Sequence, residues 1–248
     1  MIEIYTLWLR QIKRYYRSKS RIVGSLGQPL LFMLALGFGF GPIFQKAGAG
    51  NYMQFLIPGI ISMSILFMAF SSGIEVIWDR QFGFLKETLV APASRFQIML
   101  GKTLGGATVA VLQGFIVLLI SLFVGFKLPG ASMLALAFVF MFLIALLFAA
   151  LGIAIASVLE DMHGFQLIMN FLVMPIFFLS GALFPLTDLP KTILIITAID
   201  PLSYGVDGLR GTLTSAAHYG LMPDFLILTA ICAVLIAIGS YLFSKIQV

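Results

Sequence analysis

The sequence is poor in cysteine, histidine and charge, and each shortage removes a class of function. Cys232 is the only cysteine among 248 residues, so neither an internal disulfide nor a thiolate metal cluster is expected. His163 and His218 lie far apart, which leaves a metal ion without a ligand set. Only 10% of the residues are charged, against about 25% in soluble domains. A metal site and a water-soluble fold are therefore both excluded.

A complete phosphate-binding loop is also missing. Gly101-Lys102-Thr103 matches the end of such a loop, whose backbone N–H groups wrap phosphates only when a glycine stands five residues earlier. Phe96 occupies that position, and no other Gly-Lys-Ser/Thr occurs in the chain. We predict that the chain binds no cofactor and has no catalytic residue.

Hydrophobic residues make up 60% of the chain, and the mean hydropathy is +1.08. A helix needs about 20 mainly apolar residues to cross a bilayer. Six segments meet this requirement: residues 22–44, 53–78, 100–126, 131–158, 165–186 and 223–246. Their continuity indicates helices and not barrel strands. We expect an all-α, multi-pass membrane protein that forms a single domain over residues 1–248.

Residues 1–21 predict an amphipathic helix at the membrane interface, with its cations toward the lipid phosphates. At 100° per residue, five cations share one side: Arg10, Lys13, Arg14, Arg17 and Arg21. Binding of a partner protein is the alternative for this basic face. Across the chain, eleven Lys and Arg residues fall on the side of the N-terminus and four on the other side. Both termini are therefore predicted to be cytoplasmic, and the net charge of +5 reflects orientation and not nucleic-acid binding.

Two segments are too polar to span the membrane. Residues 79–98 predict a short cytoplasmic helix with an apolar face of Phe84, Leu85, Thr88 and Leu89. Exposed apolar side chains on such a helix indicate a docking surface, unless they rest on the membrane interface.

Residues 187–210 are interrupted at Asp200-Pro201 and predict two short helices that dip into the outer leaflet. We expect Asp200, Asp207 and Arg210 to pair or to cap helix ends.

Small and polar residues within the spans indicate how the helices pack. The pairs Gly37/Gly41 and Gly101/Gly105 allow close approach of helices, and Lys102 is expected at the cytoplasmic headgroups. The polar residues Gln113, Gln166, Asn170 and Ser180 are expected to face the bundle interior. For Gln166 and Asn170, interhelical hydrogen bonds are favoured over substrate contact.

Glu75 is an acid inside the second predicted span. We expect it to pair with Arg80; proton coupling is the alternative.

Three stretches resemble the ABC-2-type transporter permeases. DRQFGFLKETLVAPASRFQIMLGKTLGGA (79–107) is similar to their cytoplasmic signature, from the acid-Arg pair to the closing Gly-Lys. FQLIMNFLVMPIFFLSGALFPLTDLP (165–190) and DPLSYGVDGLRG (200–211) resemble two further blocks of the family, in the same order. Drug-resistance and nodulation-factor-export permeases are the most similar members.

The resemblance implies a coupling helix that docks on a separate ABC ATPase. Its residues would be Gly83, Phe84, Leu85, Lys86, Glu87, Leu89, Pro92, Ser94 and Arg95. Substrate path or gate candidates are Gln166, Asn170, Phe177, Ser180, Asp200, Tyr204, Asp207 and Arg210. Two permease chains and two ATPase chains would form an exporter in a prokaryotic inner membrane, with ATP and Mg²⁺ bound by the ATPase.

The substrate and two other function classes remain open. Twenty-four Phe against two Trp favour a hydrophobic or amphipathic substrate such as a drug, a lipid or a lipid-linked glycan. A polysaccharide or lipo-oligosaccharide is the alternative within the family. An ATP-independent channel or carrier would show an inverted repeat or broken midplane helices, which are not evident. An intramembrane enzyme would need a converging catalytic set, whereas Glu75, His163 and Ser180 are expected at different depths.

Overall fold

A computed structural model describes residues 2–46, 50–90, 93–187 and 189–246, which form helices and no strands. Six helical segments in these ranges are long and apolar enough to cross a membrane. They are α2 (Lys19–Lys46), α3 with α4 (Tyr52–Phe70, Ser72–Gln81), α6 (Arg95–Phe123), α7 (Ala131–Val158), α8 to α9 (Met162–Ile168, Met174–Leu179) and α12 (Leu221–Ser244). The prediction of a six-span, all-α membrane protein is confirmed.

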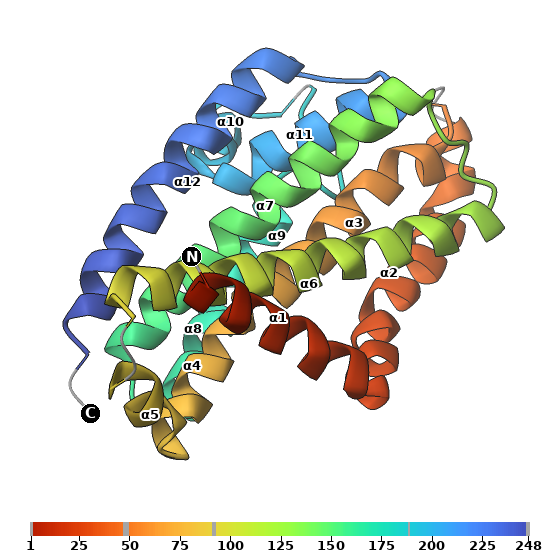
Figure 1. The fold of residues 1–248 in the computed structure, drawn as a ribbon. Helices are drawn as coiled ribbons and strands as arrows, with labels where there is room; N and C mark the ends of the chain where they lie inside the picture. Colours follow the sequence, from red (N-terminus) through yellow and green to blue (C-terminus); the bar gives the residue numbers. More distant parts are fainter. Residues whose placement is uncertain (1, 47–49, 91–92, 188, 247–248) are drawn as a thin grey trace.

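The spans form a bundle around α3 (Figure 1). α3 contacts α2, α6, α7 and α11, and every residue from Leu56 to Leu66 is buried. By contrast, only 17% of the apolar stretch is buried in each of α2, α8–α9 and α12. These outer spans therefore leave large apolar faces for lipid or for another chain.

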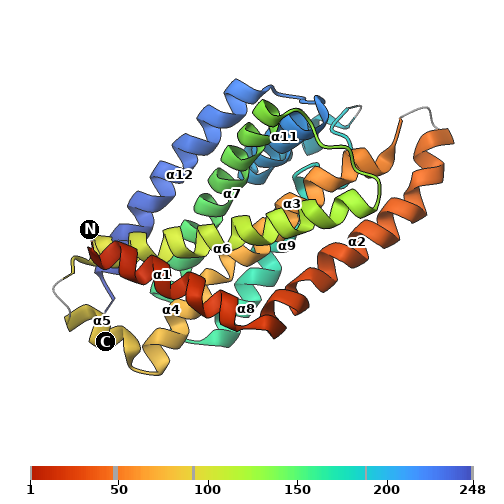
Figure 2. The ribbon, with the colours of Figure 1, turned by 45° about the vertical axis from the view of Figure 1, so that its right-hand side comes forward.

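The N-terminal helix α1 (Ile2–Arg17) is amphipathic, as predicted, and it lies along α6 (Figures 1 and 2). Gly101 and Gly105 face it. The added Cβ of a residue at Gly101 would lie 3.0 Å from Leu7 Cβ, and one at Gly105 would lie 2.6 Å from Gln11 Cγ. The predicted role of this glycine pair in close helix packing is confirmed, with α1 as the partner.

Short helices lie at both ends of the bundle (Figure 2). α5 (Phe84–Val90) lies near the start of α1 and the end of α12, and we call this end the α5 side. α10 (Lys191–Ile199) and α11 (Pro201–Thr214) lie at the other end, the α10 side, and are bent by 90° where Asp200 separates them. The predicted break at Asp200-Pro201 is confirmed. Its cause is local, because Pro fits the first turn of a helix but cannot continue the preceding one.

Gly105→Val should destabilise the chain by about 1–3 kcal/mol, since its side chain would overlap Gln11. Gly41→Val is the control, because a Cβ there meets no atom within 4 Å. Thermal unfolding of each purified variant in detergent, monitored by gel filtration, measures the loss of stability. Equal losses in the two variants would contradict close packing at Gly105.

Candidate functional site

A buried ion pair joins three helices on the α5 side. The Lys102 side chain on α6 is 1% exposed and donates to the carboxylate of Asp79 on α4. Arg10 on α1 binds the same carboxylate with two hydrogen bonds, of 3.2 Å from Nη1 and 2.8 Å from Nη2. The expectation that Lys102 lies at the headgroups is therefore wrong. α1 and α4 cover this lysine, and Asp79 supplies the counter-charge that a buried ammonium requires.

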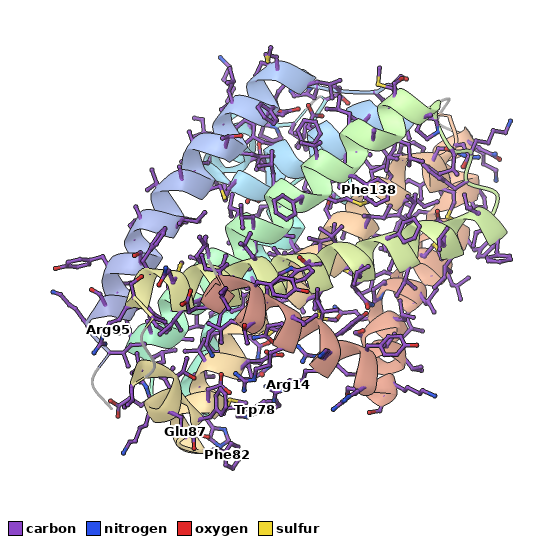
Figure 3. The ribbon with its side chains drawn as sticks, in the orientation of Figure 1. Arg14, Trp78, Phe82, Glu87, Arg95 and Phe138 are labelled. Carbon is purple, nitrogen blue, oxygen red and sulfur yellow. The ribbon has the colours of Figure 1, made fainter. Side chains whose placement is uncertain are left out.

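A second acid, Glu75, is held by the elbow between α1 and α2. Arg21 Nη1 lies 2.7 Å from Glu75 Oε1, and Arg14 Nη1 lies 3.9 Å from Oε2. The guanidinium of Arg14 also lies 5.3 Å from the ring centroid of Trp78, and Figure 3 shows the two side chains beside each other. Three of the five cations predicted to face lipid phosphates thus contact acids of α4: Arg10, Arg14 and Arg21.

The predicted pairing of Glu75 with Arg80 is wrong. Five residues of α-helix turn by about 500°, so the two side chains point to different sides of α4. Arg80 instead donates to the carbonyl oxygens of Leu159 (3.1 Å) and Ser157 (3.2 Å) at the end of α7. The last carbonyl groups of a helix lack intrahelical partners, which makes them good acceptors for this arginine.

Tyr15 extends the contact between α1 and α6 along the two helices. Its hydroxyl donates to Gln113 Oε1 over 2.7 Å, and both residues are buried. Burial raises the pKa of the Tyr15 hydroxyl, which keeps it protonated as a donor. The prediction that Gln113 faces the bundle interior is confirmed.

α5 has a buried face and an exposed face. Leu85 is completely buried, and the Arg10 guanidinium lies 3.7 Å from the ring centroid of Phe84. Lys86, Glu87 and Val90 are exposed, and Figure 3 shows Glu87 at the tip of the α5 side. The expectation that Leu85 belongs to the exposed apolar face is therefore wrong, because this side chain attaches α5 to the bundle.

The residues that flank α5 fix its two ends. Gly83 has φ +76°, a left-handed conformation that glycine adopts without strain, and it turns the chain from α4 into α5. Ser94 caps α6 in a reciprocal pair of hydrogen bonds with Gln97. Arg95 donates to the carbonyl oxygen of Ile246 over 2.6 Å, beside the end of α12 (Figure 3). Pro92 lies outside the described residues, and Leu89 is half-buried.

Most of the polar path candidates on the α10 side make hydrogen bonds within the chain. Asp200 caps α11 at Leu202 N (2.9 Å), and Asp207 accepts from the backbone N–H groups of His218 and Tyr219. The Asp200 contact is a helix cap, as expected, whereas Asp207 binds backbone groups of the chain between α11 and α12.

Arg210 donates to the Gly181 carbonyl oxygen over 2.9 Å, and its guanidinium lies 3.9 Å from the ring centroid of Phe55. Tyr204 donates to the carbonyl oxygen of Ala198, and Ser180 to that of Phe177. The Phe177 ring is buried against Phe32 and Phe67. These candidates therefore hold the α10 side together.

Gln166 and Asn170 behave differently. Both are exposed on the fifth span, where a five-residue π-helix (Met169–Val173) separates α8 from α9. The expectation that they face the interior of the bundle is wrong within this chain, and neither side chain makes a hydrogen bond to the described residues. They lie at i and i+4 and mark a polar strip on an apolar helix.

A pocket of about 370 Å³ lies between α2, α3, α6 and the π-helix, and no sequence motif indicates it directly. Its polar lining includes Arg21, Gln28, Ser64 and Gln113. These residues come from three separate spans, so only packing brings them together. The signal available in the sequence was the cost of a buried amide, which singled out Gln113 without naming its neighbours.

Comparison with known proteins places these features in a family. The profile of the ABC-2 type transporter family matches residues 2–214, which is most of the chain. The chain belongs to the ABC-2 type transporter family. It is 31% identical over 215 residues to "Putative transport permease ycf38" of Cyanophora paradoxa, covering 84% of this chain and 73% of that protein.

Two further relatives of this ABC-2 chain are each 27% identical to it. One is "Nodulation protein J" of Rhizobium leguminosarum bv. viciae, with 83% of this chain and 82% of the relative covered. The other is "Inner membrane transport permease YadH" of Escherichia coli (strain K12), with 84% and 82% covered. The family assignment thus agrees with the resemblance carried by residues 79–107 and 165–211.

In this ABC-2 permease, Asp79→Leu should lower the free energy of unfolding by about 3–5 kcal/mol, because it leaves the Lys102 ammonium buried without a carboxylate. The double variant Asp79→Leu/Lys102→Met should regain most of this loss, since an apolar pair of similar volume replaces the ion pair. Thermal unfolding in detergent measures both proteins. A double variant as unstable as Asp79→Leu would show that the pair is not the source of the effect.

Proposed function

We propose that the chain is the membrane-spanning subunit of an ATP-driven exporter whose ATP is hydrolysed by separate ABC ATPase subunits. The observation that carries this proposal is α5, a short helix outside the spans that is held on one face and exposed on the other. Leu85 and the contact between Phe84 and Arg10 fix it to the bundle. A partner that pushed on Glu87 and Val90 would therefore push on α1 and α4.

The distribution of charge supports a cytoplasmic location for the α5 side. α1 and α5 carry Lys13, Arg17 and Lys86, all exposed, and excess Lys and Arg marks the cytoplasmic face of membrane proteins. Both ends of the chain then lie in the cytoplasm, and α10 and α11 form the outer end as a re-entrant pair. The family and the relative named as an inner membrane permease favour the inner membrane of a bacterial cell.

The exposed faces of the outer spans support a second permease chain in the working unit. α2 and α8–α9 bury little of their apolar surface, and α8–α9 carries Gln166 and Asn170. A path between two chains would solvate these amides, which are costly in lipid. The rest of the surface that would line this path is apolar, so it would suit a hydrophobic or amphipathic substrate.

The purified chain alone should show neither ATP hydrolysis nor ATP-dependent transport, because Phe96 replaces the first glycine of a phosphate loop and the described residues before it form no strand. Adding the cognate ATPase should produce both activities. ATP hydrolysis and substrate flux in proteoliposomes are the measurements. Flux by the isolated chain without ATP would overturn the proposal in favour of a carrier or channel.

Glu87→Arg should abolish most of the ATPase stimulation by the permease, since it reverses the charge on the exposed face of α5. Glu160→Arg makes the same change at another exposed residue, in the loop between α7 and α8, and serves as the control. Copurification with the ATPase and ATP turnover measure both. If Glu87→Arg and Glu160→Arg behave alike, α5 is not the docking element. Leu85→Asp is unsuitable for this test, because a buried carboxylate there would unfold α5.

A further inference from the structure

The pocket between α2, α3, α6 and the π-helix has polar groups that the protein itself leaves unpaired. Gln113 is 1% exposed; its oxygen accepts from Tyr15, but its Nε2 makes no hydrogen bond to the described residues. Ser64 is 5% exposed, and its hydroxyl also has no partner there. A buried donor without a partner costs about 1–3 kcal/mol. Both side chains line the pocket, so an occupant with acceptor oxygens would satisfy them.

The electrostatics of the pocket favour an anion. Arg21 is its only charged lining residue among those described, and no carboxylate lines it. Arg21 shares Glu75 with Arg14, so two guanidinium groups face one carboxylate. A surface hollow of about 910 Å³ lies next to Arg21, and the side chains of five further cations line it. They are Arg10, Lys13, Arg14, Arg17 and Lys19.

Part of the lining is apolar and adaptable. Met63, Phe67 and Met68 of α3 and Met169 of the π-helix form this part. Methionine side chains are flexible and suit surfaces that receive alkyl chains of varying shape. Pro29, which also lines the pocket, cannot donate to the carbonyl group of Ser25, so α2 has a missing hydrogen bond here as well.

We propose that this pocket binds one anionic amphiphile, with its oxyanion headgroup between Arg21 and the Gln113 amide and its alkyl chain along Phe67 and the methionines. The identification of this molecule as cargo rests on the proposed function. The volume of about 370 Å³ falls in the range of small-molecule sites and holds a headgroup with the first part of one chain. A neutral amphiphile would add no negative charge beyond that of Glu75, which Arg21 already shares with Arg14.

The binding test uses the full chain in nanodiscs of phosphatidylcholine, which supply no acidic lipid. The probe is a lysophosphatidic acid with a photoreactive alkyl chain, and a monoacylglycerol with the same chain is the neutral control. Mass spectrometry of the irradiated protein should find the label within residues 21–29 and 63–71. The neutral probe should label these segments about tenfold less, because it lacks the charge-assisted contact with Arg21. A carboxylate with the same chain should compete, and glycerol phosphate without a chain should not.

A matched pair of variants on α2 tests the position of the site. Gly24 lines the pocket and Gly27 does not, and a Cβ at either position meets no atom within 4 Å. Gly24→Phe should reduce labelling by the acidic probe about tenfold by filling the pocket, whereas Gly27→Phe should retain it. If Gly24→Phe fails to elute as a folded protein, Ser64→Leu replaces it, because the Ser64 hydroxyl makes no hydrogen bond to the described residues.

Three labelling results would overturn the proposal. They are equal labelling by the neutral probe, labelling that Gly24→Phe and Ser64→Leu leave unchanged, and absence of label from both segments, which would mean that water alone fills the pocket. Displacement by glycerol phosphate would overturn the assignment of an amphiphile in favour of a free phosphate. The assay needs no ATPase, so its result is independent of whether Glu87→Arg uncouples the complex.

Discussion

The buried ammonium of Lys102 is the constraint on which the α5 side depends. A charge removed from water costs several kcal/mol unless a counter-charge and hydrogen bonds replace its hydration. Asp79 supplies the counter-charge, and Arg10 binds the second carboxylate oxygen, so α6, α4 and α1 must meet at one point. Gly101 and Gly105 make this meeting sterically possible, because any larger side chain there would hold α1 away from α6.

Once α1 is fixed in this way, one helix contacts both candidate sites. Near its middle, Arg10 lies over Phe84 of α5, the proposed docking helix. Toward its end, Tyr15 binds Gln113, and Arg21 at the start of α2 lines the pocket between α2, α3, α6 and the π-helix. A helix of 16 residues is about 24 Å long and resists bending over that distance. A displacement of α5 would therefore be transmitted to the pocket through α1, which is rigid, and through the acids of α4 that bind the arginines of α1.

The sequence predicted those features that depend on residues close together in the chain. The length of the apolar segments located the six spans, and Asp200-Pro201 located the bend between α10 and α11. The spacing of the cations at 100° per residue located α1. Contacts between side chains on different helices could not be predicted in this way. The Glu75–Arg80 pairing failed because rotation along α4 separates residues that are close in sequence, and Lys102 was misplaced because nothing local indicates that α1 covers it. The pocket was missed for the same reason, since its polar residues come from three spans.

The fifth span carries two exposed amide side chains on an otherwise apolar surface. Its π-helix turns Met169 toward the pocket, while Gln166 and Asn170 remain exposed one turn apart. Amide groups in hydrocarbon need hydrogen-bond partners, and the described residues of this chain provide none for these two. If α8–α9 faces a second permease chain, as proposed, water in a path or the surface of that chain would supply the partners. The same span would then border the pocket on one side and the path on the other, and a molecule leaving the pocket past Met169 would meet the amides next.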